Sequence, residues 1–335
     1  MNYLIIRNDG VGDLILSTPL INRIKSNDNK AKIYLICSNR NLSFAKLYRE
    51  NKYIHDFVLF DLNKSKLVNF VYIYKKLGNV YFNGIYVLKA SNINFFLSCI
   101  LRSSIKKYIV YKNKSKRGNF RYTPPLTLIN KTNYELIDCT NDYKNDVNTH
   151  MSDHFINLYG YDNKNYSKKY YLPEVSELGT LSNSINFLSD SSRVVIFHID
   201  EKWNKIKNSS IIIKKILEYL EIQSNIKILI TSGLEKYIYI DKVKSEFYKE
   251  NKFYYFNNMD LKSLIDLTSK TSLLITCHGA LTHISSHFNT PLIDLIDIER
   301  EHFYFKWKPK CKLSKQIDYN DVKEILETAD YYLNC

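Results

Sequence analysis

The chain has 335 residues, 45% of them hydrophobic, and carries a formal net charge of +14. This length favours two domains with sizeable cores, and no apolar stretch approaches the roughly 20 residues that would span a bilayer. The six cysteines show no metal-ligand spacing, and the first apolar run is short and ends at Arg7, so we expect neither a zinc module nor a signal peptide. These features predict a cytoplasmic enzyme with reduced thiols.

The positive charge is concentrated in one part of the sequence, residues 62–134. This stretch has no Asp or Glu but contains 14 of the 48 Lys and Arg residues, and the 34 that remain equal the 34 Asp and Glu residues of the chain. Such a field attracts anions, so a nucleic acid, an anionic membrane surface or a phosphorylated substrate is the expected partner. A lysine-rich composition throughout the chain is the alternative explanation.

Short β-rich runs alternate with helical stretches in the first half of the chain. A buried strand is expected at residues 3–7, and a helix follows with Thr18 as its cap and Pro19 at its first position. A helix that already begins at Asp13, with Pro19 as a kink, stays open as an alternative. Further strands are expected at residues 32–37, 55–59, 84–88 and 107–111. The polar residues 113–147 indicate a loop, and a helix is expected from residue 151 to 158.

The alternation restarts after a polar stretch at residues 161–170. This order predicts an α/β protein whose parallel sheets are covered by helices. We expect domains at residues 1–165 and 172–315, and a terminal segment at 316–335 that contains a helix with one apolar face. The expected strands of the second half are residues 193–198, 226–231, 253–256, 273–276 and 291–296.

Two glycines and a carboxylate, Gly10, Gly12 and Asp13, directly follow the first predicted strand. Glycine lets the backbone approach a ligand closely, and ligands of open parallel sheets bind beyond the carboxyl ends of the strands. The third glycine of a dinucleotide-binding turn and the Gly-Lys-Ser/Thr ending of a P-loop are missing, so a dinucleotide cofactor is not expected. From spacing alone, a general base and a helix cap are equally good roles for Asp13.

Residues 4–25, LIIRNDGVGDLILSTPLINRIK, resemble the N-terminal signature of the heptosyltransferase family, glycosyltransferase family 9. Residues 273–296 resemble a second family segment, in which a strand, a helix opened by glycine and a final strand follow one another. The resemblance implies an α/β protein with the GT-B fold: two Rossmann-like parallel-sheet domains, a cleft between them, and a C-terminal helix that packs back on the N-terminal domain. It also implies that Asp13 is the catalytic base.

Two further segments match family positions that contact the donor. Lys202 matches a lysine that contacts the donor diphosphate, and a compact cation suits a leaving diphosphate. Residues 228–237 match the segment that holds the donor ribose, which assigns this role to Glu235, with Ser232 and Gly233 lining the site. A solvated loop lysine and a glutamate that merely opens a helix are the alternatives.

The helix opened by Gly279 and Ala280 is expected to present its free N–H groups to a phosphate. This segment departs from the family pattern in two ways. The family's Asp position holds Cys277 or His278, and His283 lies four residues after Gly279, one more than usual. His278 can donate to a phosphate in place of the carboxylate, and a packed position within the helix is the alternative for His283.

The resemblance implies an inverting glycosyltransferase that moves a heptose-like sugar from a nucleotide-diphospho-sugar, with an ADP-heptose-like donor favoured. The acceptor would be an anionic glycolipid or lipopolysaccharide core. Lys202 and the helix N-terminus would stabilise the leaving diphosphate, so no metal or other cofactor is expected. We expect the acceptor to bind the N-terminal domain, with peripheral contact to the anionic inner face of the cytoplasmic membrane. The expected basic patch comprises Arg102, Lys106, Lys107 and Arg117.

Two other functions remain open. A nucleic-acid-binding protein would use the basic residues of the 62–134 region and the aromatic residues between them. No RRM, KH, OB or zinc signature is present, so nucleic acid is not the expected partner. A non-catalytic descendant of the same fold would have lost donor binding through the changed motif at Cys277 and His278.

Overall fold

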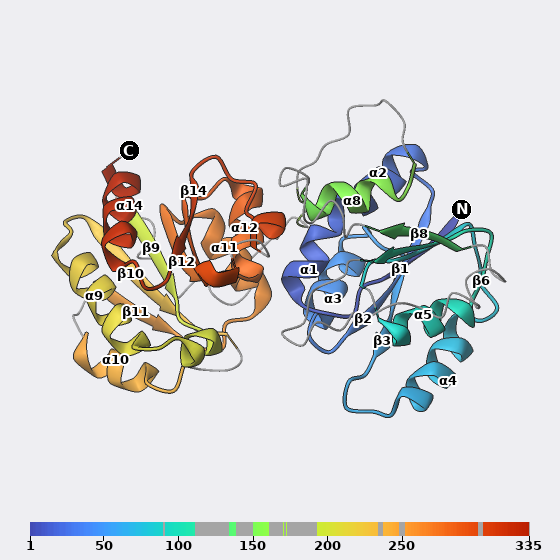
Figure 1. Ribbon diagram of the computed structural model, residues 1–335, viewed down its shortest axis with the longest axis horizontal. Coiled ribbons are helices and arrows are strands. Elements are labelled where there is room, and N and C mark those ends of the chain that lie inside the picture. Colours follow the sequence, from blue (N-terminus) through green and yellow to red (C-terminus); the bar gives the residue numbers. More distant parts are fainter. Residues whose placement is uncertain are drawn as a thin grey trace. The chain divides into compact units, whose positions relative to one another are not determined.

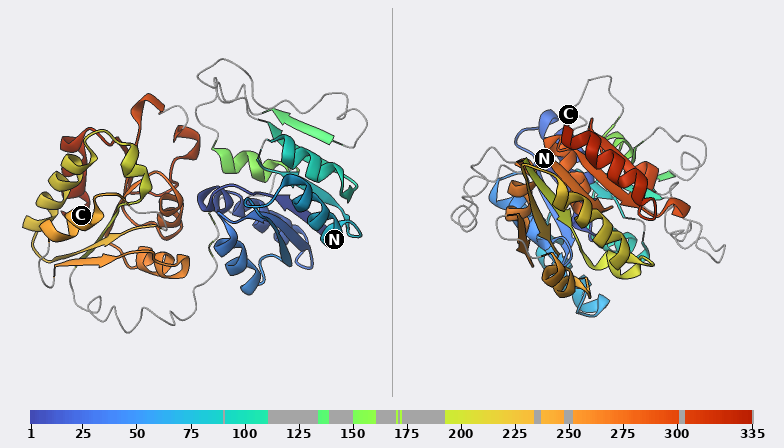
Figure 2. Two further views of the ribbon diagram at one scale, coloured as in Figure 1. Left: turned by 90° about the horizontal axis from the view of Figure 1, so that it is seen from below. Right: turned by 90° about the vertical axis from the view of Figure 1, so that its left-hand side faces the viewer.

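The structure is a computed structural model, and it divides into two compact units, Met1–Pro173 and Glu174–Cys335. Each unit is an α/β assembly with its own sheet (Figures 1 and 2). No helix of the described part is both long and apolar enough to cross a membrane. The described residues are 1–89, 91–110, 134–138, 150–160, 170, 172, 193–233, 237–247, 252–300 and 304–334.

A parallel sheet forms the centre of the N-terminal unit, with the strand order β3-β2-β1-β5-β7-β8. Leu4, Ile5 and Ile6 of β1 are fully buried. A continuous apolar run of this kind is typical of a parallel strand with both faces covered. A small separate sheet pairs β4 with β6. The strands are β1 (Asn2–Ile6), β2 (Lys32–Ser38), β3 (Asp56–Phe60), β4 (Tyr81–Phe82), β5 (Gly84–Val87), β6 (Arg102–Ser103), β7 (Lys106–Val110) and β8 (Tyr134–Asp138).

Helices cover both faces of this sheet, with α4 and α5 on one side and α1, α2 and α8 on the other (Figure 1). Buried residues of α4 and α5, among them Ile73 and Phe95, share a core with Leu4 and Ile6 of β1. The helices are α1 (Val11–Leu16), α2 (Thr18–Asn27), α3 (Leu42–Glu50), α4 (Lys66–Leu77), α5 (Asn92–Cys99) and α8 (Met151–Asn157).

The chain is helical on both sides of Ser17, which separates α1 from α2. Pro19 lies in the first turn of α2, where its missing N–H costs no hydrogen bond. The expected capping role of Thr18 is wrong, because its hydroxyl donates backwards to the carbonyl of Ile15 at 2.7 Å. The break at Ser17 starts a second helix at Thr18, so Pro19 takes the second position of this helix instead of the predicted first, and it does not kink one continuous helix.

The C-terminal unit repeats the same plan, with a parallel sheet in the order β11-β10-β9-β12-β13-β14. Figure 1 shows α9, α10 and α14 on one side of this sheet and α11 and α12 on the other. The strands are β9 (Arg193–His198), β10 (Ile226–Thr231), β11 (Phe253–Phe256), β12 (Leu273–Cys277), β13 (Leu292–Ile296) and β14 (Ser314–Asp318). The helices are η2 (Glu201–Lys205), α9 (Ser209–Ile222), α10 (Ile240–Glu246), α11 (Leu261–Ser269), α12 (Ala280–Phe288), η3 (Ile298–Arg300), η4 (Phe305–Trp307) and α14 (Val322–Asn334).

The terminal helix α14 packs within the C-terminal unit. Its buried residues Ile325, Ala329 and Leu333 belong to the same core as Val195 and Phe197 of β9. It contacts α9, β12, β13 and β14. Burial of its apolar face completes the core of its own unit. The expected packing of residues 316–335 on the N-terminal domain stays a prediction.

Candidate functional site

Both sheets have the same topology. When the strands of each main sheet are numbered in chain order, both read 3-2-1-4-5-6. In such sheets the connections leave the first and fourth strands in opposite directions, which opens a crevice at their carboxyl ends where ligands bind. The two switch points lie between β1 and β5 and between β9 and β12. The predicted site residues Asp13, Lys202 and Gly279 all follow strands at these points.

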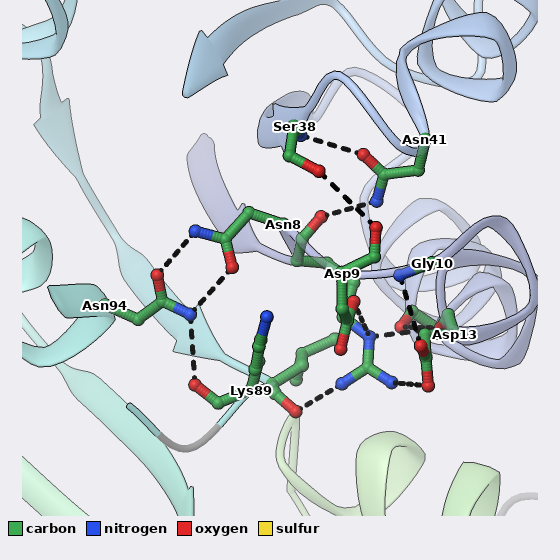
Figure 3. Close-up of polar contacts among 11 residues, drawn as sticks. Asn8, Asp9, Gly10, Asp13, Ser38, Asn41, Lys89 and Asn94 are labelled. Atoms are coloured by element: carbon green, nitrogen blue, oxygen red, sulfur yellow. Dashed lines mark hydrogen bonds and ion pairs between the residues drawn. The ribbon is translucent and has the colours of Figure 1, made fainter. Parts of the chain in front are cut away.

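Arg7 organises the switch point of the N-terminal unit, where Figure 3 labels Asp9, Gly10 and Asp13. Its side chain is fully buried, its Nη2 lies 3.0 Å from Asp13 Oδ1, and its Nε donates to the Asp13 carbonyl at 3.1 Å. Nη1 donates to the Leu88 carbonyl just beyond β5, and the guanidinium lies over the Phe155 ring, 5.1 Å from its centroid. Arg7 therefore ties the turn after β1 to the neighbouring strand and fixes one oxygen of Asp13.

Asp13 takes the capping role, one of the two that its spacing left open, and its role as a general base stays a prediction. Its Oδ2 accepts a hydrogen bond from the Gly10 N–H at 3.2 Å, which caps the first turn of α1. Its side chain is nevertheless 34% exposed, so the carboxylate is fixed on the protein side and open to solvent on the other. Gly10 makes this close approach possible, since a Cβ there would lie 3.2 Å from Asp13 Oδ2. Gly12 lies in α1, directly before Asp13.

A second carboxylate, Asp9, lies beside Asp13 and shares its arginine. Asp9 Oδ1 lies 3.1 Å from Arg7 Nε. Burial raises the pKa of Asp9 to about 6, because it outweighs the opposing charge of Arg7, and the nearby Asp13 carboxylate adds to the rise. The turn thus holds two carboxyl groups on one guanidinium.

Amide side chains hold the backbone on either side of this turn (Figure 3). Asn8 and Asn94 exchange two hydrogen bonds of 2.7 and 3.0 Å, which link the turn to α5. Asn41 donates to the Arg7 carbonyl at 2.8 Å and accepts from the Ser38 N–H at the end of β2. The carboxyl ends of β1, β2 and β5 are therefore joined by side-chain hydrogen bonds around the candidate base.

The expected basic patch is only partly supported. Lys106 is 7% exposed, and burial lowers its pKa, so its assignment to a surface patch is wrong. Lys106 and Lys107 begin β7 and pair with Ile85 and Tyr86. They lie toward the amino ends of these strands, whereas Asp13 follows the carboxyl end of β1. Arg102 is exposed, and Arg117 lies outside the described residues.

Lys202 is held at the second switch point by Asp200. Asp200 follows β9, accepts from the Lys202 N–H at 3.1 Å and binds the Lys202 amine at 2.7 Å through its other oxygen. Burial opposes the charge of this amine, but the Asp200 carboxylate raises the pKa of Lys202 above its usual value. Burial lowers the pKa of His198 to about 4, so this ring near Asp200 stays neutral. Lys202 is consequently a fixed cation with 40% of its side chain exposed.

The Lys202 amine lies against the N-terminus of α12. A Cβ on Gly279 would lie 2.5 Å from Lys202 Nζ, so only glycine leaves room for the amine at this place. Ala280 begins the helix, whose first N–H groups carry partial positive charge. A cation and a helix N-terminus thus meet at one point, which is the arrangement that binds phosphate.

His278 is fixed by a buried carboxylate, Asp294. Its Nδ1 lies 2.7 Å from Asp294 Oδ2, and the fully buried Asp294 also accepts from Thr282 and Gln316, each at 2.8 Å. Because a carboxylate oxygen only accepts hydrogen bonds, His278 donates to Asp294 through Nδ1. The other ring nitrogen, Nε2, is not used in this bond. The position of His278 after β12 is therefore as firmly built as that of Lys202.

Lys202 and His278 line the same cavity of about 240 Å³. Cys277 also borders it, and burial holds the pKa of this thiol well above its usual value, so it remains neutral. His283 is 3% exposed, and its ring packs edge-on to His278 at 5.5 Å, which makes it a packed helix residue. The remaining lining residues are Lys205, Ile206, Leu295, Asp297, Tyr304 and Tyr319.

The predicted ribose-binding segment lies close to the same strand ends. Ser232 is buried, and its hydroxyl donates to Asn257 at 3.2 Å. A Cβ on Gly233 would lie 4.0 Å from the Asp200 Cβ, which places this glycine next to the carboxylate that holds Lys202. Glu235 lies outside the described residues.

Sequence reasoning missed the residues that hold the site in place: Arg7, Asp9, Asp200 and Asp294. Arg7, Asp9 and Asp200 carry a signal, because each is a charged residue at the end of a predicted buried strand or two residues after it. Asp294 carries another, since it is a carboxylate inside the otherwise apolar run of β13.

Comparison with known proteins supports the fold. No protein-family model and no curated protein sequence matches the chain. Among solved structures, a glycosyl transferase family 9 protein from Veillonella parvula is similar with a TM-score of 0.75 at 13% identity, over 99% of this chain and 97% of that one. The chain has the GT-B fold.

Two further structures share the GT-B fold over nearly their whole length. ADP-heptose lipopolysaccharide heptosyltransferase II of E. coli has a TM-score of 0.68 at 16% identity, over 99% of this chain and 98% of that one. The E. coli heptosyltransferase WaaC with ADP has a TM-score of 0.67 at 12% identity, over 100% and 99%. Within this GT-B chain, Asp13 belongs to the N-terminal unit, and Lys202 and Gly279 belong to the C-terminal unit.

Proposed function

We propose that the protein is an inverting glycosyltransferase that moves a sugar from a nucleotide-diphospho-sugar to a hydroxyl group of an acceptor. The observation that carries the proposal is the meeting of the Lys202 amine and the N-terminus of α12 at Gly279. Fixed positive charge at this point would stabilise a departing diphosphate. A heptosyltransferase with the same fold was solved with ADP and with an ADP-heptose analogue, which favours an ADP-heptose-like donor here.

In the proposed reaction, Asp13 accepts the proton of the acceptor hydroxyl as its oxygen attacks the anomeric carbon of the donor. The bond between this carbon and the diphosphate oxygen breaks, and the electron pair leaves with the diphosphate. Arg7 positions Asp13 through the 3.0 Å ion pair, while the exposed part of the carboxylate remains free to receive the proton. Lys202, oriented by Asp200, compensates the charge that develops on the leaving group.

We further propose an anionic glycolipid, of the lipopolysaccharide-core type, as the acceptor, together with peripheral contact to an anionic membrane surface. The acid-free stretch at residues 62–134 supports both parts of this proposal, because a local excess of positive charge attracts phosphorylated lipids. A non-catalytic descendant is the second candidate, favoured by the departure from the family pattern at Cys277 and His278.

Thermal-shift measurements with ADP, GDP, UDP, CDP and NAD test the donor half of the proposal. We expect one nucleoside diphosphate to stabilise the protein, and Lys202→Ala to abolish the shift. Lys207→Ala, which removes an exposed lysine of the same segment outside the cavity lining, is the matched control and should keep it. Stabilisation by NAD alone, or no shift with any nucleotide, would overturn the transferase assignment.

Turnover with the nucleotide-sugar identified in this way tests the role of Asp13. Asp13→Asn keeps the size of the side chain but removes the base, so we expect kcat to fall by about 100-fold or more while the affinity for the nucleoside diphosphate stays unchanged. A variant that retains kcat would exclude Asp13 as the base. A variant that loses nucleotide affinity instead would point to a structural role.

A further inference from the structure

Helix α4 of the N-terminal unit carries apolar side chains on both of its sides. Asn69, Ile73 and Leu77 face inward and are buried. The outward face, which consists of Leu67, Val68, Val71, Tyr72 and Tyr74, is exposed, from 45% for Tyr72 to 71% for Leu67. A surface helix of a globular protein normally turns polar side chains to water, so an apolar outward face indicates an interaction surface.

The outward face is continuous around the helix. With 3.6 residues per turn, its five side chains cover an arc of about 160°. Lys75 lies within this arc, and Lys76 lies at its edge. Lys66 is exposed in the first turn of α4, and Lys64 lies just before the helix. The apolar surface is thus interrupted by Lys75 and bordered by Lys76, whereas Lys66 lies on the side of Ile73 and Leu77.

Acidic side chains are scarce beside this surface. No Asp or Glu occurs between residues 62 and 134, a stretch that contains all of α4 and α5. Asp61 precedes it, and its carboxylate lies 3.7 Å from the Lys64 amine. Lys66, Lys75 and Lys76 form no ion pair with a carboxylate of the described part of the chain. The charge beside the apolar surface therefore remains positive.

We infer that the outward face of α4 inserts into the interface of an anionic lipid bilayer, with Lys75 and Lys76 on the lipid headgroups. Long lysine side chains can keep their amines at headgroup level while the neighbouring apolar groups enter the acyl boundary. The two tyrosines suit the same boundary, since their rings are apolar and their hydroxyls polar. Anionic headgroups match the charge of the surface.

A second copy of the chain fits this surface less well. A two-fold symmetric contact places the same patch on both sides, so Lys75 and Lys76 of one copy would meet the lysines of the other. An anionic bilayer instead supplies both an apolar phase and opposite charge. The inference rests on the membrane contact that is part of the proposed function, and it names α4 as the element that makes this contact. It does not depend on sugar transfer.

Cosedimentation of the full chain with lipid vesicles tests the inference. We expect binding to vesicles of phosphatidylcholine mixed with phosphatidylglycerol, and much weaker binding to phosphatidylcholine alone. The double variant L67Q/V71Q should lower the partition coefficient about tenfold, because it removes apolar groups from the insertion face. K75Q/K76Q should weaken binding and reduce its salt dependence. The control I211Q/I222Q changes two exposed isoleucines of α9 and should bind like the wild type.

Three outcomes would overturn the inference. They are absence of wild-type binding to the anionic vesicles, equal binding by L67Q/V71Q, and a lipid-free dimer in analytical ultracentrifugation that L67Q/V71Q abolishes. Every substituted side chain is exposed, so we expect the variants to keep the wild-type melting temperature. Measuring this temperature shows that the variants fold. The thermal shift with nucleoside diphosphate is measured on the same samples. A retained shift without vesicle binding would reject this inference alone, whereas a missing shift would reject the transferase proposal.

Discussion

Replacement of Gly279 by alanine would test the proposed diphosphate site without removing a charge. The added Cβ would lie 2.5 Å from Lys202 Nζ and 3.6 Å from Lys202 Cε. Non-bonded contacts of this kind need about 3.5 Å, so the amine must move by roughly 1 Å. The group that moves is the end of a flexible side chain. The φ of Gly279 is 178°, an extended value that alanine adopts without strain, so folding should be little affected.

The displaced amine would lose its place at the N-terminus of α12. A hydrogen bond to a charged group contributes about 1.5–3 kcal/mol, and its loss would raise the Kd for the nucleoside diphosphate about 10- to 150-fold. Isothermal titration calorimetry measures this Kd, and differential scanning calorimetry measures the melting temperature of the same sample. We expect a large change in the Kd and a small one in the melting temperature.

Gly233 provides the matched control at the same strand ends. A Cβ there would lie 4.0 Å from the Asp200 Cβ, an ordinary contact, so Gly233→Ala should keep the wild-type Kd. If Gly279→Ala also kept the wild-type Kd, the Lys202 amine would not hold the diphosphate. A marked fall in the melting temperature would show instead that Lys202 cannot yield.

The carboxyl groups of Asp294 and Asp9 give further predictions. Asp294→Asn should lower the free energy of unfolding by about 2–4 kcal/mol, because one of the oxygens that accept from His278, Thr282 and Gln316 becomes a donor; a loss below about 0.5 kcal/mol in urea unfolding would contradict this. The pKa of Asp9, about 6 in the folded protein, lies above the unfolded value of about 3.9, so the folded state binds the proton more tightly between these pH values. Stability should therefore fall as pH rises from about 4 to 6, by up to about 3 kcal/mol in total, and Asp9→Asn should remove this decline. Parallel pH profiles of the wild type and Asp9→Asn would refute the assignment.

Three strands of the C-terminal sheet, β9, β10 and β11, have the expected bounds. All three are mainly apolar runs bordered by polar residues, although β11 lies at the edge of its sheet. The outer strands β8 and β14 were not predicted. In β14 only Ile317 is buried, since an edge strand needs little apolar surface, and β8 lies within the polar stretch that indicated a loop.

The site was predictable only as separate pieces. Lys202 and Gly279 were singled out independently, but their contact depends on β9 and β12 being neighbours in the sheet, which spacing along the chain does not reveal. The same holds for Arg7, whose Nη1 donates to the Leu88 carbonyl because β1 pairs with β5. Local patterns specify each turn, whereas the strand order decides which turns meet.

The packing of α14 has a consequence for how the two halves of this protein can change. Ile325, Ala329 and Leu333 complete a core in which the other members lie between residues 195 and 317. Among the described residues, the core beneath Lys202 and Gly279 consists of side chains of the C-terminal unit. A C-terminal half taken from a relative should therefore carry its own terminal helix with it, because this helix supplies part of that core.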